Sequence, residues 1–384
     1  MYERIQRLTS IATDSLFLWG ARQTGKSTLL KALFPQARFY DLLKSDTYAR
    51  LSVSPATLRQ EVQLMPSGSV VVIDEVQKVP SLLDEVHWLM TNCDIRFVLC
   101  GSSARKLRRQ GVNLLGGRAL REVLYPLVSA EIPDFDLDRA VNNGMLPRHY
   151  AVENPKRRMQ AYIGDYLQQE IVAESIVRRL DSFTRFLSVA AMSDADVVNY
   201  TNIAQDCGIS AKSVKEYFSI LEETLLGYMI PAFSRGGKRR VVMAPKFYYF
   251  DVGIPNYLLG RLRLQRGTAA YGHAFEHLMV QETIAYLGYY FHGAKSLAYW
   301  RTADHKEVDM VIGDAEVAIE IKTTTNARSR DTAGLKDFGE DFPHARLILV
   351  THDPYPKLLN GVEVLPAEDF LRQLWAHDIV KRRE

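Results

Sequence analysis

The residues with the clearest chemical meaning lie near the N-terminus. Gly20, Gly25, Lys26 and Ser27 follow the spacing GxxxxGK[ST], directly after the apolar run Leu16–Trp19. Glycines at these positions let backbone amides turn toward phosphate oxygens, and a helix that starts here adds partial positive charge. We therefore predict a site for ATP, in which Lys26 binds the outer phosphates and Ser27 binds Mg²⁺. The predicted cradle consists of Gly20, Ala21, Arg22, Gln23, Thr24, Gly25, Lys26, Ser27 and Thr28.

A pair of acids follows a second apolar run. Val70–Ile73 provides four apolar residues in a row, which is typical of a buried central strand, and Asp74 and Glu75 come directly after it. Here an aspartate can hold Mg²⁺, and a glutamate beside it can polarise the attacking water. The pair favours hydrolysis of the nucleotide over nucleotide sensing alone.

A third group of charged residues lies near the C-terminus. If Glu307–Ile312 and Glu316–Lys322 form a hairpin, its register brings Asp309, Glu320 and Lys322 together. Carboxylate oxygens suit Mg²⁺, and a lysine beside them can orient water or steady phosphate charge. The same register turns three apolar residues to the opposite face: Val308, Met310 and Ile312. The alternative is a solvated, charged hairpin.

A nucleic-acid module is predicted in the middle of the chain. The apolar spacing from Ile203 to Leu221 suits two helices joined at Gly208, with Ser210 as the N-cap of the second. This pattern resembles a helix-turn-helix, and a following strand pair with a basic tip makes it winged. The predicted DNA contacts are Lys212, Ser213 and Lys215 on the second helix, and Arg235, Lys238, Arg239 and Arg240 on the wing. A lid or dimer module with a solvated basic turn is the alternative.

The scaffold that positions these residues is predicted to be α/β. Short apolar runs alternate with helical stretches, which indicates a parallel sheet with helices on both faces. The expected N-terminal strands are Ser15–Trp19, Arg38–Asp41, Val70–Asp74 and Arg96–Cys100. A helical stretch follows at Met159–Arg179, then a β-rich patch at Gly227–Phe250. The last part is predicted to contain a helix at Ala269–Leu287 and strands at Ala298–Arg301, Glu307–Ile312, Glu316–Lys322 and Arg346–Thr351.

We expect three domains: an AAA-type P-loop domain at 1–150, a winged-helix module at 151–265 and a second α/β domain at 266–384. The 384 residues are 47% hydrophobic and 24% charged, with a net charge of +3, so any DNA binding must depend on local clusters. Cys93, Cys100 and Cys207 lie far apart and fit reduced packing residues. The N-terminus lacks the features of a secretory signal, and no apolar run approaches membrane-spanning length. A cytoplasmic protein without a membrane partner is therefore expected.

Taken in order, the motifs resemble a large prokaryotic family of AAA-superfamily ATPases. In that family a winged helix and a C-terminal restriction-endonuclease-like domain follow the ATPase. The matching motifs are Gly20–Ser27, Asp74-Glu75, Gly101-Ser102-Ser103, Gly116-Gly117-Arg118, Tyr125-Pro126-Leu127 and Tyr249–Gly253. One departure is Asn143-Gly144-Met145-Leu146-Pro147, where a tighter Gly-Gly-x-Pro turn is expected.

The resemblance implies further roles in the ATPase. Ser102 or Ser103 is similar to the polar sensor that touches the γ-phosphate or the water. Arg118 resembles an arginine finger that a neighbouring subunit supplies, which implies a homo-oligomer, with a hexamer as one option. Such a finger contributes about 10³–10⁵ in turnover. The alternative is a surface arginine, because four more arginines are close by: Arg105, Arg108, Arg109 and Arg121.

The resemblance also interprets the C-terminal charges. Asp309, Glu320 and Lys322 resemble the PD-(D/E)XK nuclease signature, with Glu276 as an additional acid on the preceding helix. Glu276, Asp309 and Glu320 would then be metal ligands, and a degenerate nuclease fold kept for binding is the other interpretation. His273 and His277 flank Glu276 but fit helix-face histidines better than zinc ligands.

Together these features predict an ATP-hydrolysing, DNA-binding ATPase that acts in DNA remodelling, repair or defence. Metal-dependent DNA cleavage by the C-terminal domain is left open as an additional activity. The alternative is a nucleotide-switched protein that binds DNA or another protein and whose nuclease-like domain does not cut.

Overall fold

The computed structural model describes residues 2–102, 105, 107, 115–167, 180–234, 241–261 and 263–381. The chain divides into two units. The first contains Met1–Tyr125 with Glu223–Leu225, and the second contains Pro126–Glu222 with Leu226–Glu384. We expected residues 126–150 to be part of the P-loop domain. In the structure they belong to the second unit.

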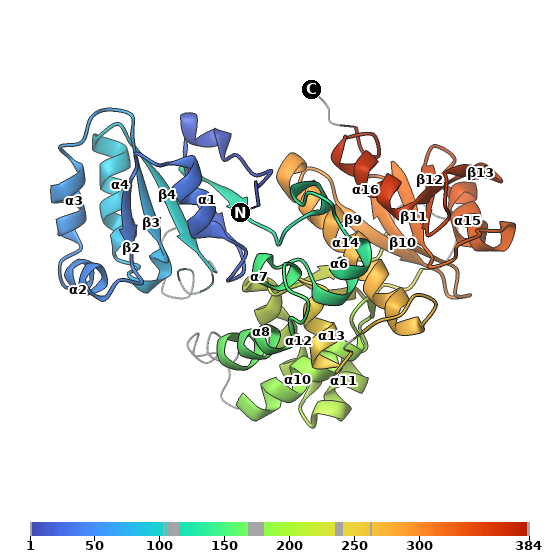
Figure 1. The fold of residues 1–384 in the computed structure, drawn as a ribbon. Helices are drawn as coiled ribbons and strands as arrows, with labels where there is room; N and C mark the ends of the chain where they lie inside the picture. Colours follow the sequence, from blue (N-terminus) through green and yellow to red (C-terminus); the bar gives the residue numbers. More distant parts are fainter. Residues whose placement is uncertain are drawn as a thin grey trace. The chain divides into compact units, whose positions relative to one another are not determined.

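A five-stranded parallel sheet forms the centre of the first unit, with strand order β2-β3-β4-β1-β5 (Figure 1). The strands are β1 (Ser15–Trp19), β2 (Arg38–Asp41), β3 (Ser69–Asp74), β4 (Ile95–Gly101) and β5 (Ala119–Val123). The four predicted strands are confirmed to within one residue at each end, and the predicted α/β fold with a parallel sheet is confirmed with them.

Helices cover both faces of this sheet because its strands are apolar on both sides. One face packs Phe17, Ile73 and Leu99 against α2, α3 and α4, and the other packs Leu16 and Val98 against α1. Figure 1 shows α3 and α4 on the side of the sheet opposite α1. The helices are α1 (Lys26–Leu33), α2 (Ser45–Val53), α3 (Ala56–Val62) and α4 (Leu82–Asn92).

The second unit contains two sheets. The larger has six strands in the order β13-β14-β12-β11-β10-β9, and the smaller has three antiparallel strands in the order β6-β8-β7. The six strands are β9 (Leu297–Arg301), β10 (Glu307–Ile312), β11 (Val317–Ile321), β12 (Arg346–Thr351), β13 (Lys357–Leu359) and β14 (Val362–Pro366). The three are β6 (Asp196–Val197), β7 (Gly227–Ile230) and β8 (Lys246–Tyr249).

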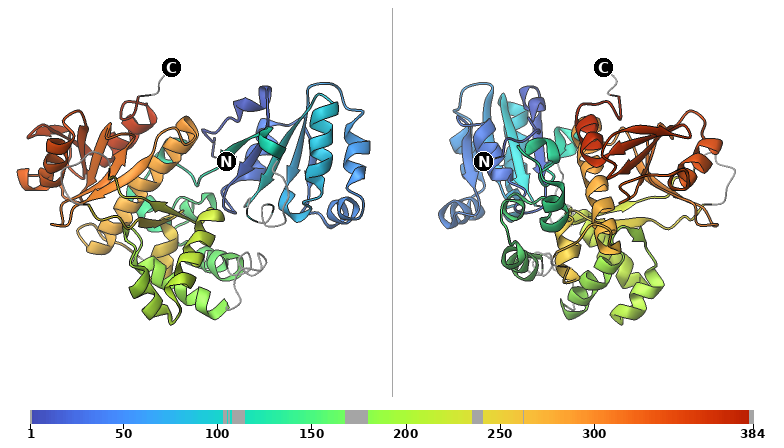
Figure 2. Two further views of the ribbon diagram at one scale, coloured as in Figure 1. Left: turned by 180° about the vertical axis from the view of Figure 1, so that it is seen from behind. Right: turned by 45° about the vertical axis from the view of Figure 1, so that its right-hand side comes forward.

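Helix α14 connects the two sheets of this unit. Its His277 contacts the end of β8, and its Phe275 packs 4.5 Å from His352, which follows β12. Figures 1 and 2 show it in orange. The helices from residue 126 onward are α6 (Leu137–Asn143), α7 (Pro147–Tyr150), α8 (Lys156–Ala161), α10 (Leu180–Met192), α11 (Tyr200–Cys207), α12 (Ala211–Glu223), α13 (Gly253–Leu258), α14 (Ala269–Phe291), α15 (Ala333–Asp341) and α16 (Ala367–Trp375).

The predicted side-chain alternation in β10 is wrong. Val308 pairs with Trp300 of β9 and Val311 pairs with Ala298, so three steps along β10 face two along β9. This β-bulge contains Asp309 and places Val308 and Val311 in the same core. The strict period of two would have grouped Val308 with Met310 and Ile312. Bulges are common beside functional sites because they redirect a side chain.

The predicted helix at Met159–Arg179 is only partly described. It begins as α8, and Tyr162–Leu167 then forms a π-helical turn. The remainder, 168–179, lies outside the described residues.

Gly144 explains the unexpected turn before Pro147. Its φ of 76° and ψ of 179° are a conformation that is essentially restricted to glycine. The buried Asp251 accepts hydrogen bonds from the backbone N–H groups of Met145 (2.7 Å) and Gly253 (2.9 Å). A Cβ on Gly144 would lie 2.0 Å from Asp251 Oδ1, so the turn and the carboxylate require each other.

Gly144→Ala is expected to lower the free energy of unfolding by about 2–3 kcal/mol, because backbone strain adds to the contact with Asp251. Urea denaturation followed by tryptophan fluorescence measures this. Gly260→Ala is the matched control, since Gly260 has φ +66° but a Cβ there would meet nothing within 4 Å. The control should lose only about 1 kcal/mol. Equal losses would mean that Asp251 plays no part.

Candidate functional site

The GxxxxGK[ST] loop has the backbone that a phosphate cradle requires. It joins β1 to α1, and Gln23 (φ 65°) and Gly25 (φ 99°) are both left-handed. A Cβ on Gly20 would lie 2.5 Å from the Leu124 carbonyl oxygen, so only glycine fits between the loop and the chain after β5. Thr24 Oγ1 donates to the Ala21 carbonyl at 2.9 Å, which closes the turn.

Lys26 and Ser27 are the first two residues of α1 and follow this turn directly. Lys26 Nζ donates to the carbonyls of Gly20 (2.6 Å) and Ala21 (3.0 Å). Ser27 Oγ donates to Asp74 Oδ2 at 2.5 Å, which joins the loop to the end of β3. Asp74 is 2% exposed, and its Oδ1 is buried without a hydrogen-bond partner among the described residues. The two motifs that we predicted to cooperate are therefore in contact.

Glu75 adopts a left-handed backbone conformation (φ 59°) directly after β3. Gln77 Nε2 donates to Glu75 Oε2 at 2.6 Å and to Ser102 Oγ at 3.2 Å. Gln77 therefore connects the predicted base to the predicted sensor, while Ser103 lies outside the described residues. We did not predict a role for Gln77, and its position two residues after the Asp-Glu pair was the only available signal. Gly101 permits this contact, because a Cβ there would lie 2.3 Å from Gln77 Oε1.

Arg4 is a second residue that sequence reasoning missed. Its Nη1 donates to the Thr24 carbonyl at 2.6 Å and its Nη2 to the Tyr125 carbonyl at 2.8 Å. The buried guanidinium thus holds the phosphate loop to the segment after β5. No motif spacing signals this contact, because Arg4 is 20 residues before the loop residue that it binds.

Arg118 lies at the opposite end of the sheet from the phosphate loop. Ser15 pairs with Ala119 and Trp19 pairs with Val123, so Arg118 adjoins the start of β1 whereas the loop follows its end. Four residue steps at ~3.3 Å separate the two ends by about 13 Å. The side chain is exposed and contacts His87 of α4. Arg118 therefore lies far from the nucleotide site of its own chain.

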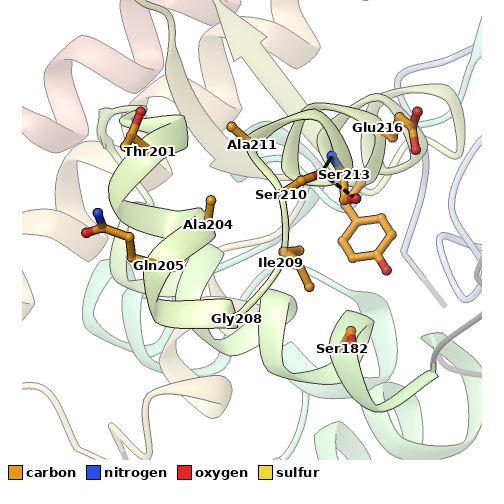
Figure 3. Close-up of a pocket in the computed structure, with 11 residues that line it drawn as sticks. Ser182, Thr201, Ala204, Gln205, Gly208, Ile209, Ser210, Ala211, Ser213 and Glu216 are labelled. Carbon is orange, nitrogen blue, oxygen red and sulfur yellow. Dashed lines mark hydrogen bonds between the residues drawn. The ribbon is translucent and has the colours of Figure 1, made fainter.

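The two helices predicted between Ile203 and Leu221 are present as α11 (Tyr200–Cys207) and α12 (Ala211–Glu223). Gly208 between them has a φ of 65°, and Ser210 Oγ accepts from the backbone N–H of Ser213 at 3.1 Å as an N-cap. An open hollow of about 970 Å³ lies at this turn, and Figure 3 draws the residues that line it. Among the described residues, its lining includes Glu216 and neutral residues but no lysine or arginine.

The predicted DNA-contacting residues on α12 have different environments. Lys212 is exposed, whereas Lys215 lies 5.2 Å from the centre of the Tyr200 ring as a cation–π pair. The Ser213 hydroxyl pairs with Ser210 Oγ at 2.9 Å. On the predicted wing, Arg235, Lys238, Arg239 and Arg240 lie outside the described residues. The chain on both sides of them pairs with β9, through Ala232 with Tyr299 and Val241 with Thr302.

Lys246 lies at the centre of the charged residues in the second unit. Its Nζ is 3.0 Å from Glu276 Oε1, 2.6 Å from Glu307 Oε1 and 3.3 Å from Asp309 Oδ1. These residues come from β8, α14 and β10. Tyr248, which faces the same side of β8, donates to Glu276 Oε1 at 2.8 Å. We did not predict roles for Lys246 or Glu307, because only the folded chain brings β8 against α14.

Glu320 and Lys322 lie on the other side of Asp309, and their Oε1 and Nζ are 2.8 Å apart. We call the whole group the carboxylate–lysine cluster: Lys246, Glu276, Glu307, Asp309, Glu320 and Lys322. Asp309 Oδ2 accepts from the backbone N–H of Ile321 at 2.8 Å, which places Asp309 between Lys246 and the Glu320–Lys322 pair. Glu276, Asp309, Glu320 and Lys322 are thus gathered in one place. Within the described ranges, however, no three or more His, Cys, Asp or Glu side chains are arranged to hold a metal ion. A metal site here stays a prediction.

Burial controls the ionisation of the cluster. It raises the pKa of Glu276 to about 7, with a further contribution from Asp309, while Lys246 opposes the rise. It also raises the pKa of Glu320 to about 7 against the effect of Lys322. Burial alone would lower the pKa of Lys246, but Glu276, Tyr248, Asp309 and Glu307 raise it well above its usual value. Lys246 therefore keeps its charge at neutral pH.

Comparisons with known proteins define the class of the first unit. Residues 12–132 match a family model described as an AAA domain, and the first unit is accordingly an AAA-type P-loop ATPase domain. Residues 134–265 and 271–370 match two models described as domains of unknown function, DUF8612 and DUF4143. None of the curated proteins matches the chain.

Several solved structures are similar in part. The Walker-type ATPase PABY2304 of Pyrococcus abyssi is 13% identical over 63% of this chain and 90% of its own, with a TM-score of 0.41. The Orc1 protein of Aeropyrum pernix, solved in complex with DNA, is 12% identical over 64% and 86%, with a TM-score of 0.26. A STAND protein with a tetratricopeptide repeat sensor from Pyrococcus horikoshii is 13% identical over 75% and 45%, with a TM-score of 0.22. Scores this low carry no conclusion about function.

No helix in the described ranges combines the length and the apolar character that a membrane crossing needs.

Proposed function

We propose that the first unit hydrolyses ATP with Mg²⁺ and that the second unit couples this hydrolysis to DNA, in remodelling, repair or defence. The observation that carries the proposal is the hydrogen bond between Ser27 and Asp74, with Glu75 beside it. A phosphate loop, a metal-binding pair and an acid are the parts that nucleotide hydrolysis requires.

The residues at the loop fit a magnesium ion. Ser27 Oγ and both oxygens of Asp74 are hard ligands, and Asp74 Oδ1 is buried without a hydrogen-bond partner among the described residues. Ser27 and Asp74 would hold the ion. When bound, Mg²⁺ would neutralise charge on the phosphates.

The neighbouring residues divide the remaining work. Lys26 would exchange its two carbonyl acceptors for phosphate oxygens, which are stronger acceptors for an ammonium group. Glu75 would orient the attacking water and accept its proton. Gln77 and Ser102 hold Glu75 in place through the contacts described above, and a fixed base is more effective than a mobile one.

Arg118 supports an assembly of several copies of this chain. Because it lies at the other end of the sheet from its own phosphate loop, a role at a nucleotide requires a neighbouring subunit. We propose a homo-oligomer with Arg118 as a trans-acting finger, with a hexamer as one option for its size.

DNA is proposed to contact the second unit at α12 and the basic tip at 235–240. Lys212 is exposed at the first turn of α12, where it can reach phosphate oxygens. Lys215 would leave the Tyr200 ring to do the same, and the four cations of the tip add a local positive patch.

ATP turnover with duplex, branched and single-stranded DNA tests the coupling. We expect one DNA form to stimulate turnover. Lys212→Ala/Lys215→Ala should raise the DNA concentration for half-maximal stimulation roughly tenfold and lower the salt slope by about two. Lys336→Ala/Lys381→Ala removes two exposed lysines elsewhere in this unit and is the matched control. Turnover that no DNA alters would leave an ATPase that responds to another partner.

A second candidate is a nucleotide-switched protein that binds DNA or another protein without cutting DNA. Lys246 favours it, because its ammonium occupies the predicted acid set and no metal ligand set is found in the described ranges. Cleavage by Glu276, Asp309, Glu320 and Lys322 stays a prediction of the sequence.

A further inference from the structure

The carboxylate–lysine cluster already has a cation at its centre. An ammonium group has three N–H donors, and Lys246 has three carboxylate oxygens within 3.3 Å, one each from Glu276, Glu307 and Asp309. The Lys246 side chain is 2% exposed. Buried carboxylates are costly unless a positive charge compensates them. Lys246 supplies that charge from within the chain.

The backbone fixes Lys246 in this position. Strand β8 is the central strand of its sheet, and Lys246 pairs with Val197 of β6 on one side and Ile230 of β7 on the other. The ring of Tyr299 lies 5.7 Å from Nζ as a cation–π contact. Moving the ammonium away would therefore require the three-stranded sheet to shift or the stem to abandon this contact as well.

Lys246 and a metal ion would compete for the same oxygen. Asp309 Oδ2 is engaged by the backbone N–H of Ile321, so Oδ1 is the oxygen left for a cation, and Lys246 holds it. A divalent ion at the usual ligand distance of about 2.1 Å from Oδ1 would also lie beside the positive ammonium. Like charges at such a distance repel each other strongly in a buried site.

The cluster retains one oxygen that a second cation could use. Glu320 is 6% exposed, and its Oε2 has no hydrogen-bond partner among the described residues. As the side chains stand, no three acids of the described ranges surround one ion position. If Lys246 lost its charge, the Asp309 and Glu320 oxygens and Glu276 would have to turn toward the vacated position to supply the hard ligands that Mg²⁺ or Mn²⁺ prefers.

We infer that the Lys246 ammonium is the resident cation of this cluster and takes the place of a divalent metal, so that Mg²⁺ or Mn²⁺ binds only when Lys246 is neutralised. The second unit then keeps the acids of a nuclease-like site as an internal ion cluster. This inference does not depend on ATP hydrolysis by the first unit.

Titration with Mn²⁺, followed by the electron paramagnetic resonance signal of the free ion, tests the inference. Full-length proteins carry Asp74→Asn throughout so that the first unit does not contribute. The protein that carries only Asp74→Asn should show no Mn²⁺ binding that depends on Asp309, at Mn²⁺ concentrations up to about 1 mM. Lys246→Met should bind one Mn²⁺ per chain at least tenfold more tightly, and adding Asp309→Asn should remove that gain. Lys306→Met, at a half-exposed lysine of the same unit that pairs with Asp337, should change nothing.

Two results would overturn the inference. One is Mn²⁺ binding by the chain with Lys246 intact that Asp309→Asn abolishes, since lysine and metal would then coexist. The other is a folded Lys246→Met protein that binds no Mn²⁺. If Lys246→Met does not fold, Lys246→Gln retains a hydrogen-bond donor without the charge. The arm with Lys246 intact can overturn the inference even if neither variant folds.

Discussion

Replacing Glu75 with glutamine is expected to lower kcat for ATP hydrolysis by about 10²–10⁴-fold while ATP still binds. Glutamine keeps the size of the side chain and can still accept from Gln77 through its amide oxygen, but it cannot take a proton from water. The phosphate loop and the Ser27–Asp74 pair remain intact in this variant. Steady-state turnover, together with binding of a fluorescent ATP analogue, measures the two effects separately.

The matched control is Glu85→Gln, the same substitution at a half-buried ion pair with Arg59. It should leave turnover within about twofold, because Glu85 makes no contact with the residues of the phosphate loop or with Glu75 in the hydrogen bonds described above. If Glu75→Gln keeps more than a tenth of the turnover, another group activates the water. If the variant loses ATP binding as well, Glu75 stabilises the phosphate loop, and its role is structural and not that of a catalytic base.

The parts of the site that sequence reasoning predicted are those that short segments determine. The phosphate loop, β3 with its two acids and the turn at Gly208 each depend on neighbouring residues and on strong backbone preferences. Arg4, Gln77 and Lys246 were missed for one reason. Each makes a contact that only tertiary packing creates, which for Gln77 is the bond to Ser102. No spacing rule relates Arg4 to Thr24 or Lys246 to Glu276.

The carboxylate–lysine cluster shows a different limit of prediction. The strands β10 and β11 were predicted almost to the residue, yet the bulge at Asp309 broke the assumed alternation. An inserted residue leaves no composition signal, because Asp309 and Met310 fit a regular strand equally well. The predicted acids still meet, since Asp309 Oδ2 binds the backbone of Ile321 directly.

His277 is a buried histidine of α14 that makes two hydrogen bonds within the second unit. Its ring is 0% exposed, with Nδ1 2.7 Å from Asp194 Oδ2 and Nε2 2.8 Å from the Tyr249 carbonyl. Both partners are acceptors, so both ring nitrogens must carry protons and the ring is an imidazolium. Asp194 Oδ1 also accepts from the backbone N–H of Tyr249 at 2.9 Å. The pair therefore links α14 to β8.

His277→Ala is expected to lower the free energy of unfolding by about 3–5 kcal/mol, because it leaves the Asp194 carboxylate buried without its positive partner. Urea denaturation of full-length protein measures the loss. His273→Ala is the matched control one turn earlier on α14, where the side chain is only half-buried. That variant should lose less than about 1 kcal/mol. Similar losses in both would mean that the helix surface, and not the ion pair, is responsible.

The same pair sets the sign of a pH effect. Burial lowers the pKa of His277, whereas Asp194 and, after it, Asp251 raise it. The two carboxylates together outweigh burial, so the pKa in the folded state is higher than usual. Stabilisation from this proton is complete below the unfolded value of about 6.5 and is lost as the pH rises through the folded-state value. Glu276, Glu282 and Glu320, with pKa values raised to about 7, titrate over the same range. They are present in both the wild type and His277→Ala, so their effect cancels in the difference between the two proteins. The difference in unfolding free energy between wild type and His277→Ala should therefore be largest below pH 6.5 and shrink above it. A difference that grows with pH would show that the ring is neutral in the folded chain, with one of its two acceptors left unpaired.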